Sequence, residues 1–178
     1  MAGLGLVLLA AWLLRYDIAL HTIRRHGLTR YIAAALLSGY VWLGVGGALE
    51  LWAGGVPAGY SYDAALHAVF VGFIMSMIFG HALIIVPALT RRALPYRPVF
   101  YAPLALLSVS LAARVFGDLA GDSGWRMAGG LLNAMAIVLF MVLLVYSVFA
   151  PAPAGDAGAR VAASGRTART DAASRFRR

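Results

Sequence analysis

The chain has 178 residues, of which 62% are hydrophobic and 12% are charged. Soluble domains average about 25% charged residues, and a soluble core of this size could not bury so much apolar surface. The absence of cysteine excludes disulfides, iron–sulfur clusters and thiolate-bound zinc or haem. The net charge of +8 comes from 15 arginines, which lie mainly in connections and in the C-terminal tail. We interpret them as markers of membrane orientation and predict no nucleic-acid partner.

Four hydrophobic segments reach the length of about 20 residues that a membrane-spanning helix needs. They are Ile32–Trp52, Ala64–Leu89, Phe100–Gly117 and Met127–Ala150. An earlier segment from Gly3 is cleanly apolar only to Leu14, and it spans only if its helix continues through Arg15 and Asp17 to about Ile23. We therefore predict an all-α, polytopic transmembrane helix bundle over residues 1–150, with five helices, or four if the first does not span.

Arginines are concentrated in every second connection between the hydrophobic segments. Residues 24–30 and 91–97 each contain three arginines, whereas residues 53–63 contain none. Because basic loops stay in the cytoplasm, this pattern predicts a bacterial inner-membrane protein with its N-terminus outside and its C-terminus inside. Residues 151–178 have almost no large apolar side chain, so we expect a disordered, Arg-rich cytoplasmic tail.

The third hydrophobic segment carries two histidines, His67 and His81, that are fourteen residues apart. Along an α-helix this spacing falls about 40° short of four full turns and corresponds to about 21 Å along the axis. Both imidazoles are therefore expected on one helix face, with Ala68, Gly72, Ser76 and Gly80 on the opposite, packing face. This spacing is used by diheme cytochrome b helices, and imidazole is a common haem ligand. We predict that His67 and His81 bind b-type haem or a metal.

Each histidine needs a second ligand. The remaining histidines are His21 and His26, and His21 could reach the level of His81, which makes it a third cofactor-binding candidate. No imidazole of the chain can meet His67, so Met127, Met135 or the His67 of a second protomer is considered there. The ligand count favours a homo-oligomer or a subunit of a larger membrane complex.

We expect the other polar residues of the hydrophobic segments to have structural roles. Arg114 and Asp118 are four residues apart, which predicts an ion pair within one helix. Asn133 is expected to bond to a neighbouring helix. No nucleophile–base set, P-loop or zinc-hydrolase motif is present, so no catalytic residue is assigned and enzymatic activity is left open.

The run from Tyr62 to about Gly117 resembles the NnrS-type membrane proteins, a haem- and copper-containing group associated with the bacterial response to nitric oxide. The residues that carry the resemblance are Leu66-His67-Ala68 with Gly72, Ile78-Phe79-Gly80-His81, Arg114 and Leu132-Asn133-Ala134. The resemblance implies b-type haem held by membrane histidines, with copper as the second choice. Those proteins are larger, with about twice as many spans.

The first functional hypothesis is an inner-membrane protein that binds haem or a metal through His67 and His81, for electron transfer or for defence against nitric oxide or respiratory stress. The second is a cofactor-free membrane subunit or assembly factor that packs on a larger complex. In that case the histidines bond to neighbouring helices. A third is a small transporter-like unit in which His81 handles protons, although the helix breaks and paired carboxylates expected of one are not evident in the sequence.

Overall fold

The computed structural model describes residues 2–54, 58–91 and 96–149, and the predicted tail lies outside these ranges. The described residues are helical, and four helices are long and apolar enough to cross a membrane. The polytopic helical bundle is therefore confirmed. The spanning helices are α3 (Leu28–Ala53), the continuous run of α4 (Tyr60–His67), η1 (Ala68–Ile74) and α5 (Met75–Thr90), the run of η2 (Pro98–Phe100) and α6 (Tyr101–Ala120), and α7 (Ser123–Phe149).

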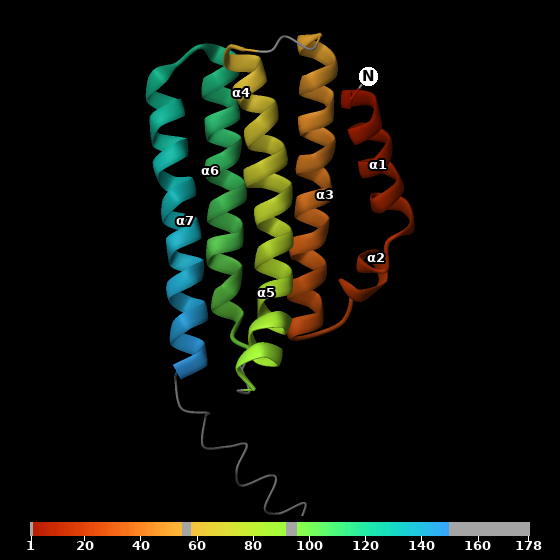
Figure 1. Ribbon diagram of the computed structural model, residues 1–178, viewed down its shortest axis with the longest axis vertical. Helices are drawn as coiled ribbons and strands as arrows, with labels where there is room; N and C mark the ends of the chain where they lie inside the picture. The colour runs from red at the N-terminus through yellow and green to blue at the C-terminus, as the bar shows by residue number, and fades with distance from the viewer. Residues whose placement is uncertain (1, 55–57, 92–95, 150–178) are drawn as a thin grey trace, which may run out of the picture.

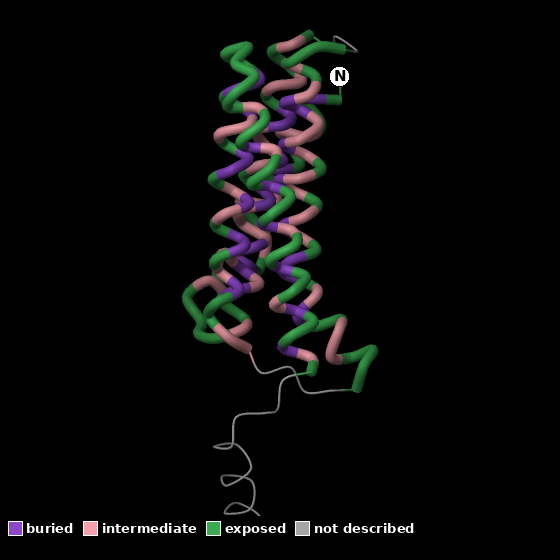
Figure 2. Tube along the Cα trace, turned by 90° about the vertical axis from the view of Figure 1, so that its left-hand side faces the viewer, coloured by how far each residue is buried: buried purple, intermediate pink, exposed green. Residues whose placement is uncertain are grey.

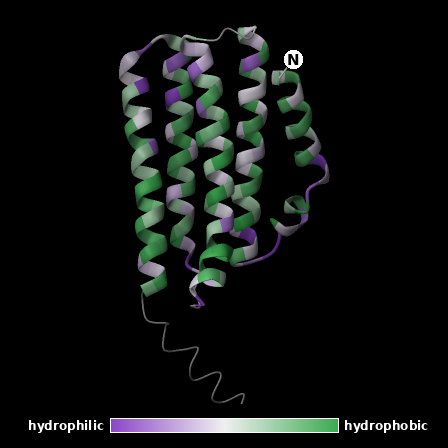
Figure 3. Ribbon diagram, viewed as in Figure 1, coloured by the Kyte–Doolittle hydropathy of each residue, from purple (hydrophilic) through white to green (hydrophobic). Residues whose placement is uncertain are grey.

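Successive spanning helices lie side by side and run in opposite directions (Figure 1). The bundle therefore has two distinct ends. We call the end where α4 begins and α6 meets α7 the α4 end, and the opposite end, where α3 begins, the α2 end. Buried positions follow the lines where helices meet, and exposed positions cover the outer sides (Figure 2). The helices are apolar over most of their length (Figure 3), and many of their exposed residues are large hydrophobics, as expected of a surface that faces lipid.

The first apolar segment does not form a continuous spanning helix. Helix α1 (Ala2–Tyr16) is a shorter apolar helix that ends before Asp17, and one further turn, α2 (Ala19–Thr22), follows. The Asp17 carboxylate stabilises this break in the helix. It accepts hydrogen bonds from the Ala19 amide at 2.7 Å and from the Tyr40 hydroxyl at 3.1 Å. Of the two predicted helix counts, the structure has four spanning helices.

Helix α3 packs closely on both of its neighbours through glycine. A Cβ on Gly3 of α1 would lie 2.7 Å from the Gly47 carbonyl oxygen of α3. On the other side, a Cβ on Gly72 would lie 2.5 Å from Trp42 of α3. A Cβ on Gly80 would likewise lie 3.2 Å from the Ala35 Cβ of α3. The contacts of Gly72 and Gly80 confirm the predicted small-residue packing face of the third hydrophobic segment, because only residues without large side chains allow such close approach.

The π-helical segment η1 changes which way His67 and His81 point. A π-turn closes i→i+5 bonds and holds about one more residue than an α-turn, so it offsets the following side chains by about 100°. The two histidines are then about 140° apart around the axis, and the prediction of about 40° is wrong. In a regular α-helix, each four-residue step turns about 40° past a full turn, so residues at this spacing move gradually around the axis. The offset compensates for this movement, and five small residues at this spacing are all buried: Ala64, Ala68, Gly72, Ser76 and Gly80.

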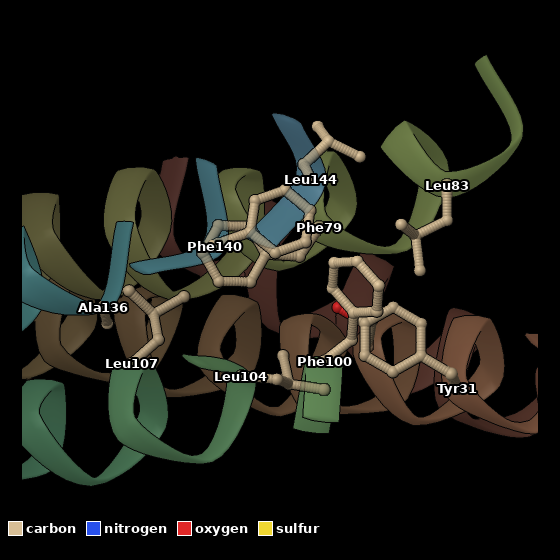
Figure 4. Close-up of a cluster of buried hydrophobic side chains, with 10 residues drawn as sticks. Tyr31, Phe79, Leu83, Phe100, Leu104, Leu107, Ala136, Phe140 and Leu144 are labelled. Atoms are coloured by element: carbon tan, nitrogen blue, oxygen red, sulfur yellow. The ribbon is translucent and has the colours of Figure 1, made fainter. Parts of the chain in front are cut away.

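An aromatic core fills the half of the bundle nearer the α2 end. Phe79 of α5 and Phe140 of α7 stack with ring centroids 3.9 Å apart, and Phe100 meets Phe140 edge-on at 5.9 Å (Figure 4). Tyr31 of α3 completes the cluster against Phe100 at 6.1 Å. Because side chains occupy the interior at the level of Phe79, the neighbouring His81 is directed to the outside of the bundle, where it is exposed.

Candidate functional sites: an ionic cluster and two imidazoles

An ionic cluster joins three helices at the α4 end, where hydrophilic residues gather (Figure 3). Asp63 of α4 lies 2.8 Å from the Arg114 guanidinium of α6 and 3.3 Å from that of Arg126 of α7. Arg126 also donates through Nε to Asp118 of α6 at 2.5 Å. The charges of two carboxylates and two guanidinium groups thus cancel within the chain. This pairing lowers the free-energy cost of placing charged groups beside the hydrocarbon region.

Glycine allows the backbones of α6 and α7 to approach closely at this cluster. A Cβ on Gly129 would lie 2.6 Å from the Arg114 amide nitrogen, and one on Gly117 would lie 2.6 Å from the Arg126 amide nitrogen. Arg114 Nη1 donates to the Arg126 carbonyl at 3.2 Å. The Arg126 guanidinium also lies 4.3 Å from the ring centroid of Tyr60, a cation–π contact that adds α4 to the same junction.

The predicted ion pair between Arg114 and Asp118 is wrong. Arg114 pairs with Asp63 of α4 instead, and Asp118 pairs with Arg126 of α7. Spacing within α6 permits the intrahelical pair, but facing carboxylate and guanidinium groups from other helices are available once the bundle has packed. The expectation for Asn133 is confirmed, because its side-chain oxygen accepts a hydrogen bond from Ser110 of α6 at 2.6 Å.

His67 lies beside this cluster. Its Nδ1 is 2.8 Å from the Asp63 carbonyl oxygen and 3.4 Å from the Asp63 carboxylate, and the side chain is 28% exposed. Because a carbonyl oxygen can only accept, Nδ1 carries the proton, and the Nε2 lone pair of a neutral ring is left available. His67 thus combines an available ligand atom with a charged environment.

His81 has the same backbone bond in different surroundings. Its Nδ1 lies 2.8 Å from the Met77 carbonyl oxygen, which again leaves Nε2 available. The ring borders an almost entirely apolar groove of about 420 Å³ on the outer side of α5. The other residues that line the groove are Met77, Ile78, Ala82, Ile85 and Val86.

The structure does not bring the three predicted cofactor-binding histidines together. His21 is exposed on α2, which packs on α3, and α3 separates α2 from α5 (Figure 1). His67 and His81 lie at different depths on one continuous helical run. Within residues 2–54, 58–91 and 96–149, no group of three or more histidine, aspartate or glutamate side chains could hold a metal ion.

Sequence reasoning did not single out Asp63 and Arg126. The signal that could have found Asp63 is its position four residues before His67, where the two share a helix face. In the sequence, Arg126 is a lone basic residue near the turn between the last two hydrophobic segments. Its partners come from other helices, so no spacing rule within one helix reveals it.

These features define a polytopic helical membrane protein with an ionic cluster at one end and two imidazoles on one helical run. Residues 1–149 match the family model described as a domain of unknown function, DUF8744. The match covers most of the chain, so the chain belongs to this family. No curated protein and no solved structure matches it.

Proposed function

We propose that this chain is a bacterial inner-membrane subunit that holds a b-type haem through His81 and acts in electron transfer. The observation that supports this is the His81 imidazole, whose Nδ1 is bonded to the Met77 carbonyl at 2.8 Å while its other face borders an apolar groove. Ring nitrogens that bind metals generally have this kind of partner on the opposite nitrogen, because it fixes the tautomer and the ring orientation.

The residues around His81 fit one face of a haem. An apolar wall would suit the macrocycle, and the His81 imidazole would supply a ligand to the iron. Haem, when bound, supplies a reversible one-electron couple at its iron. The chain's own part is to orient the imidazole and to keep its surroundings apolar. A second ligand would come from another chain, because the groove beside His81 lies on the outer side of α5.

His67 is the second choice for haem. Its Nε2 is available in the same way, but the neighbouring Asp63, Arg114 and Arg126 form a charged rather than an apolar surface. Copper at either histidine would need ligands beyond the described residues, in which no three-ligand group occurs. An association with the nitric-oxide response rests on the resemblance to NnrS-type proteins.

Membrane orientation is part of the proposal. The described arginines Arg24, Arg25, Arg30, Arg91 and Arg97 flank the helix ends at the α2 end. The positive-inside rule then assigns the α2 end to the cytoplasm and the α4 end, with its ionic cluster, to the outside.

The visible spectrum of the purified protein tests the haem proposal. The full chain is expressed in a haem-producing bacterium, extracted in mild detergent and measured in its oxidised and dithionite-reduced states. A reduced b-type spectrum with haem in proportion to the protein is the expected result. A colourless protein that remains helical and takes up no added haemin would contradict the proposal and favour the cofactor-free subunit.

A further inference from the structure

Two charged residues of the broken first segment, Arg15 and Asp17, lie deep in the membrane-spanning part of the protein. Helices α1 and α3 run antiparallel, and the Ala10 Cβ would lie 3.5 Å from a Cβ on Gly44. Arg15 follows Ala10 by five residues, which corresponds to a rise of about 8 Å along α1. It therefore lies about level with Gly39, near the centre of α3. The hydrocarbon core is about 30 Å thick, so both residues fall within it.

Arg15 belongs to an open face of the protein. It is exposed, and next to it runs a stripe of exposed residues at four-residue spacing: Leu4, Leu8, Trp12 and Tyr16. A guanidinium on a lipid-facing surface near the bilayer centre is costly, and snorkelling relieves that cost mainly near helix ends. The open face of α1 is therefore a poor surface to leave against lipid.

Neither charge is neutralised within the described residues. The ion pairs found there involve only Asp63, Asp118, Arg114, Arg126 and His67. Arg15 contacts the ring of Tyr16 at 5.7 Å, and Asp17 accepts hydrogen bonds only from neutral groups. Asp17 follows the end of α1, and its carboxylate is directed to the Ala19 amide and to Tyr40 of α3 rather than to Arg15. The carboxylate still has lone pairs for a further donor.

We infer that α1 is the contact face of a homodimer in which Arg15 of each copy pairs with Asp17 of the other. A twofold interface is isologous, so a contact from one residue to another occurs twice with the roles exchanged. Arg15 is exposed at the end of α1, and Asp17 is partly exposed in the break that follows. In the dimer these two charges of opposite sign become two ion pairs in a single contact. The apolar stripe beside Arg15 supplies the surrounding surface.

Cysteine cross-linking in native membranes tests this interface, and the natural absence of cysteine gives a clean background. Ile18 is 72% exposed beside the two charges, and Val138, on the outer side of α7, is 60% exposed. We expect Ile18→Cys to form disulfide-linked dimers and Val138→Cys, the matched control, to remain monomeric. Equal cross-linking at both positions, or none at Ile18, would overturn the homodimer.

Charge variants in the Ile18→Cys background test the reciprocal pairing. Arg15→Leu removes both ion pairs and should lower the cross-linked fraction by at least about tenfold, because the loss of one interhelical polar contact of about 1.4 kcal/mol already corresponds to a tenfold change. Arg15→Asp and Asp17→Arg should each prevent cross-linking alone. Co-expression of these two chains, carrying different tags, should restore a mixed dimer, since one copy then presents two acids and the other two arginines. An unchanged Arg15→Leu variant, or no mixed dimer from chains that retain their helical circular dichroism, would refute the pairing.

Discussion

Asp63 Oδ2 lies 2.8 Å from Arg114 Nη2 and joins α4 to α6 across 51 positions of the chain. The same carboxylate oxygen lies 3.3 Å from Arg126 of α7, so one side chain connects three helices. The opposite half of the bundle is held by the stacked rings of Phe79 and Phe140. The two halves are thus stabilised by different interactions, ionic at the α4 end and aromatic packing toward the α2 end.

Replacement of Asp63 tests the importance of the ionic cluster. Asp63→Asn keeps the size of the side chain but leaves Arg114 without its carboxylate, and Asp63 is only partly exposed, at 32%. We expect a loss of about 1–3 kcal/mol of stability, less than for a fully buried pair. Thermal unfolding in detergent, followed by circular dichroism, measures it. Glu50→Gln, which removes a charge outside the cluster, is the control, and equal stability of the two variants would refute this role of Asp63.

Close helix contact at Gly129 gives a second prediction. In Gly129→Ala the added methyl group would lie 2.6 Å from the Arg114 amide nitrogen, so α6 and α7 must separate, at a cost of about 1–3 kcal/mol. Gly44→Ala is the matched control, because the nearest atom to the new Cβ is the Ala10 Cβ at 3.5 Å, an ordinary van der Waals contact, and alanine has the higher helix propensity. The same melting experiment should show a lower midpoint for Gly129→Ala and no decrease for Gly44→Ala. A Gly129→Ala protein as stable as the wild type would contradict the close packing.

Much of the fold follows from the sequence, because hydrocarbon thickness and backbone hydrogen bonding leave few choices for an apolar chain. The predicted segment Ala64–Leu89 lies within the observed helical run from Tyr60 to Thr90, and Ile32–Trp52 lies within α3. The small residues from Ala68 to Gly80 also revealed the packing face. The break at Asp17 was harder to predict, because it depends on the Tyr40 hydroxyl of another helix.

Contacts between helices account for what sequence reasoning missed at the candidate sites. Arg114 has one acidic residue at the right spacing within its own helix, and nothing in that spacing reveals that Asp63 lies closer in space. The π-helical segment is another case, since no residue type between Ala68 and Ile74 predicts that a turn contains an extra residue. Consequently, the placement of His67 and His81 on one helical run follows from the sequence, but their directions around the helix axis do not.

Orientation is tested by labelling from one side of the membrane. We expect Ser123→Cys, at the start of α7 in the α4 end, to react with a membrane-impermeant maleimide in intact spheroplasts, because the positive-inside rule leaves this end outside. A tag placed after Arg178 should be accessible only after the membrane is opened. Labelling in the reverse pattern would contradict the orientation without affecting the fold.

The haem content of two matched histidine variants tests the proposed role of His81 most directly. His81→Ala and His67→Ala are purified in the same detergent as the wild type, and each is titrated with haemin while circular dichroism confirms that it remains helical. We expect the wild type and His67→Ala to show the reduced b-type spectrum and His81→Ala to lose it. Retention of the full spectrum by His81→Ala, or its loss only in His67→Ala, would contradict the assignment of His81 as the ligand.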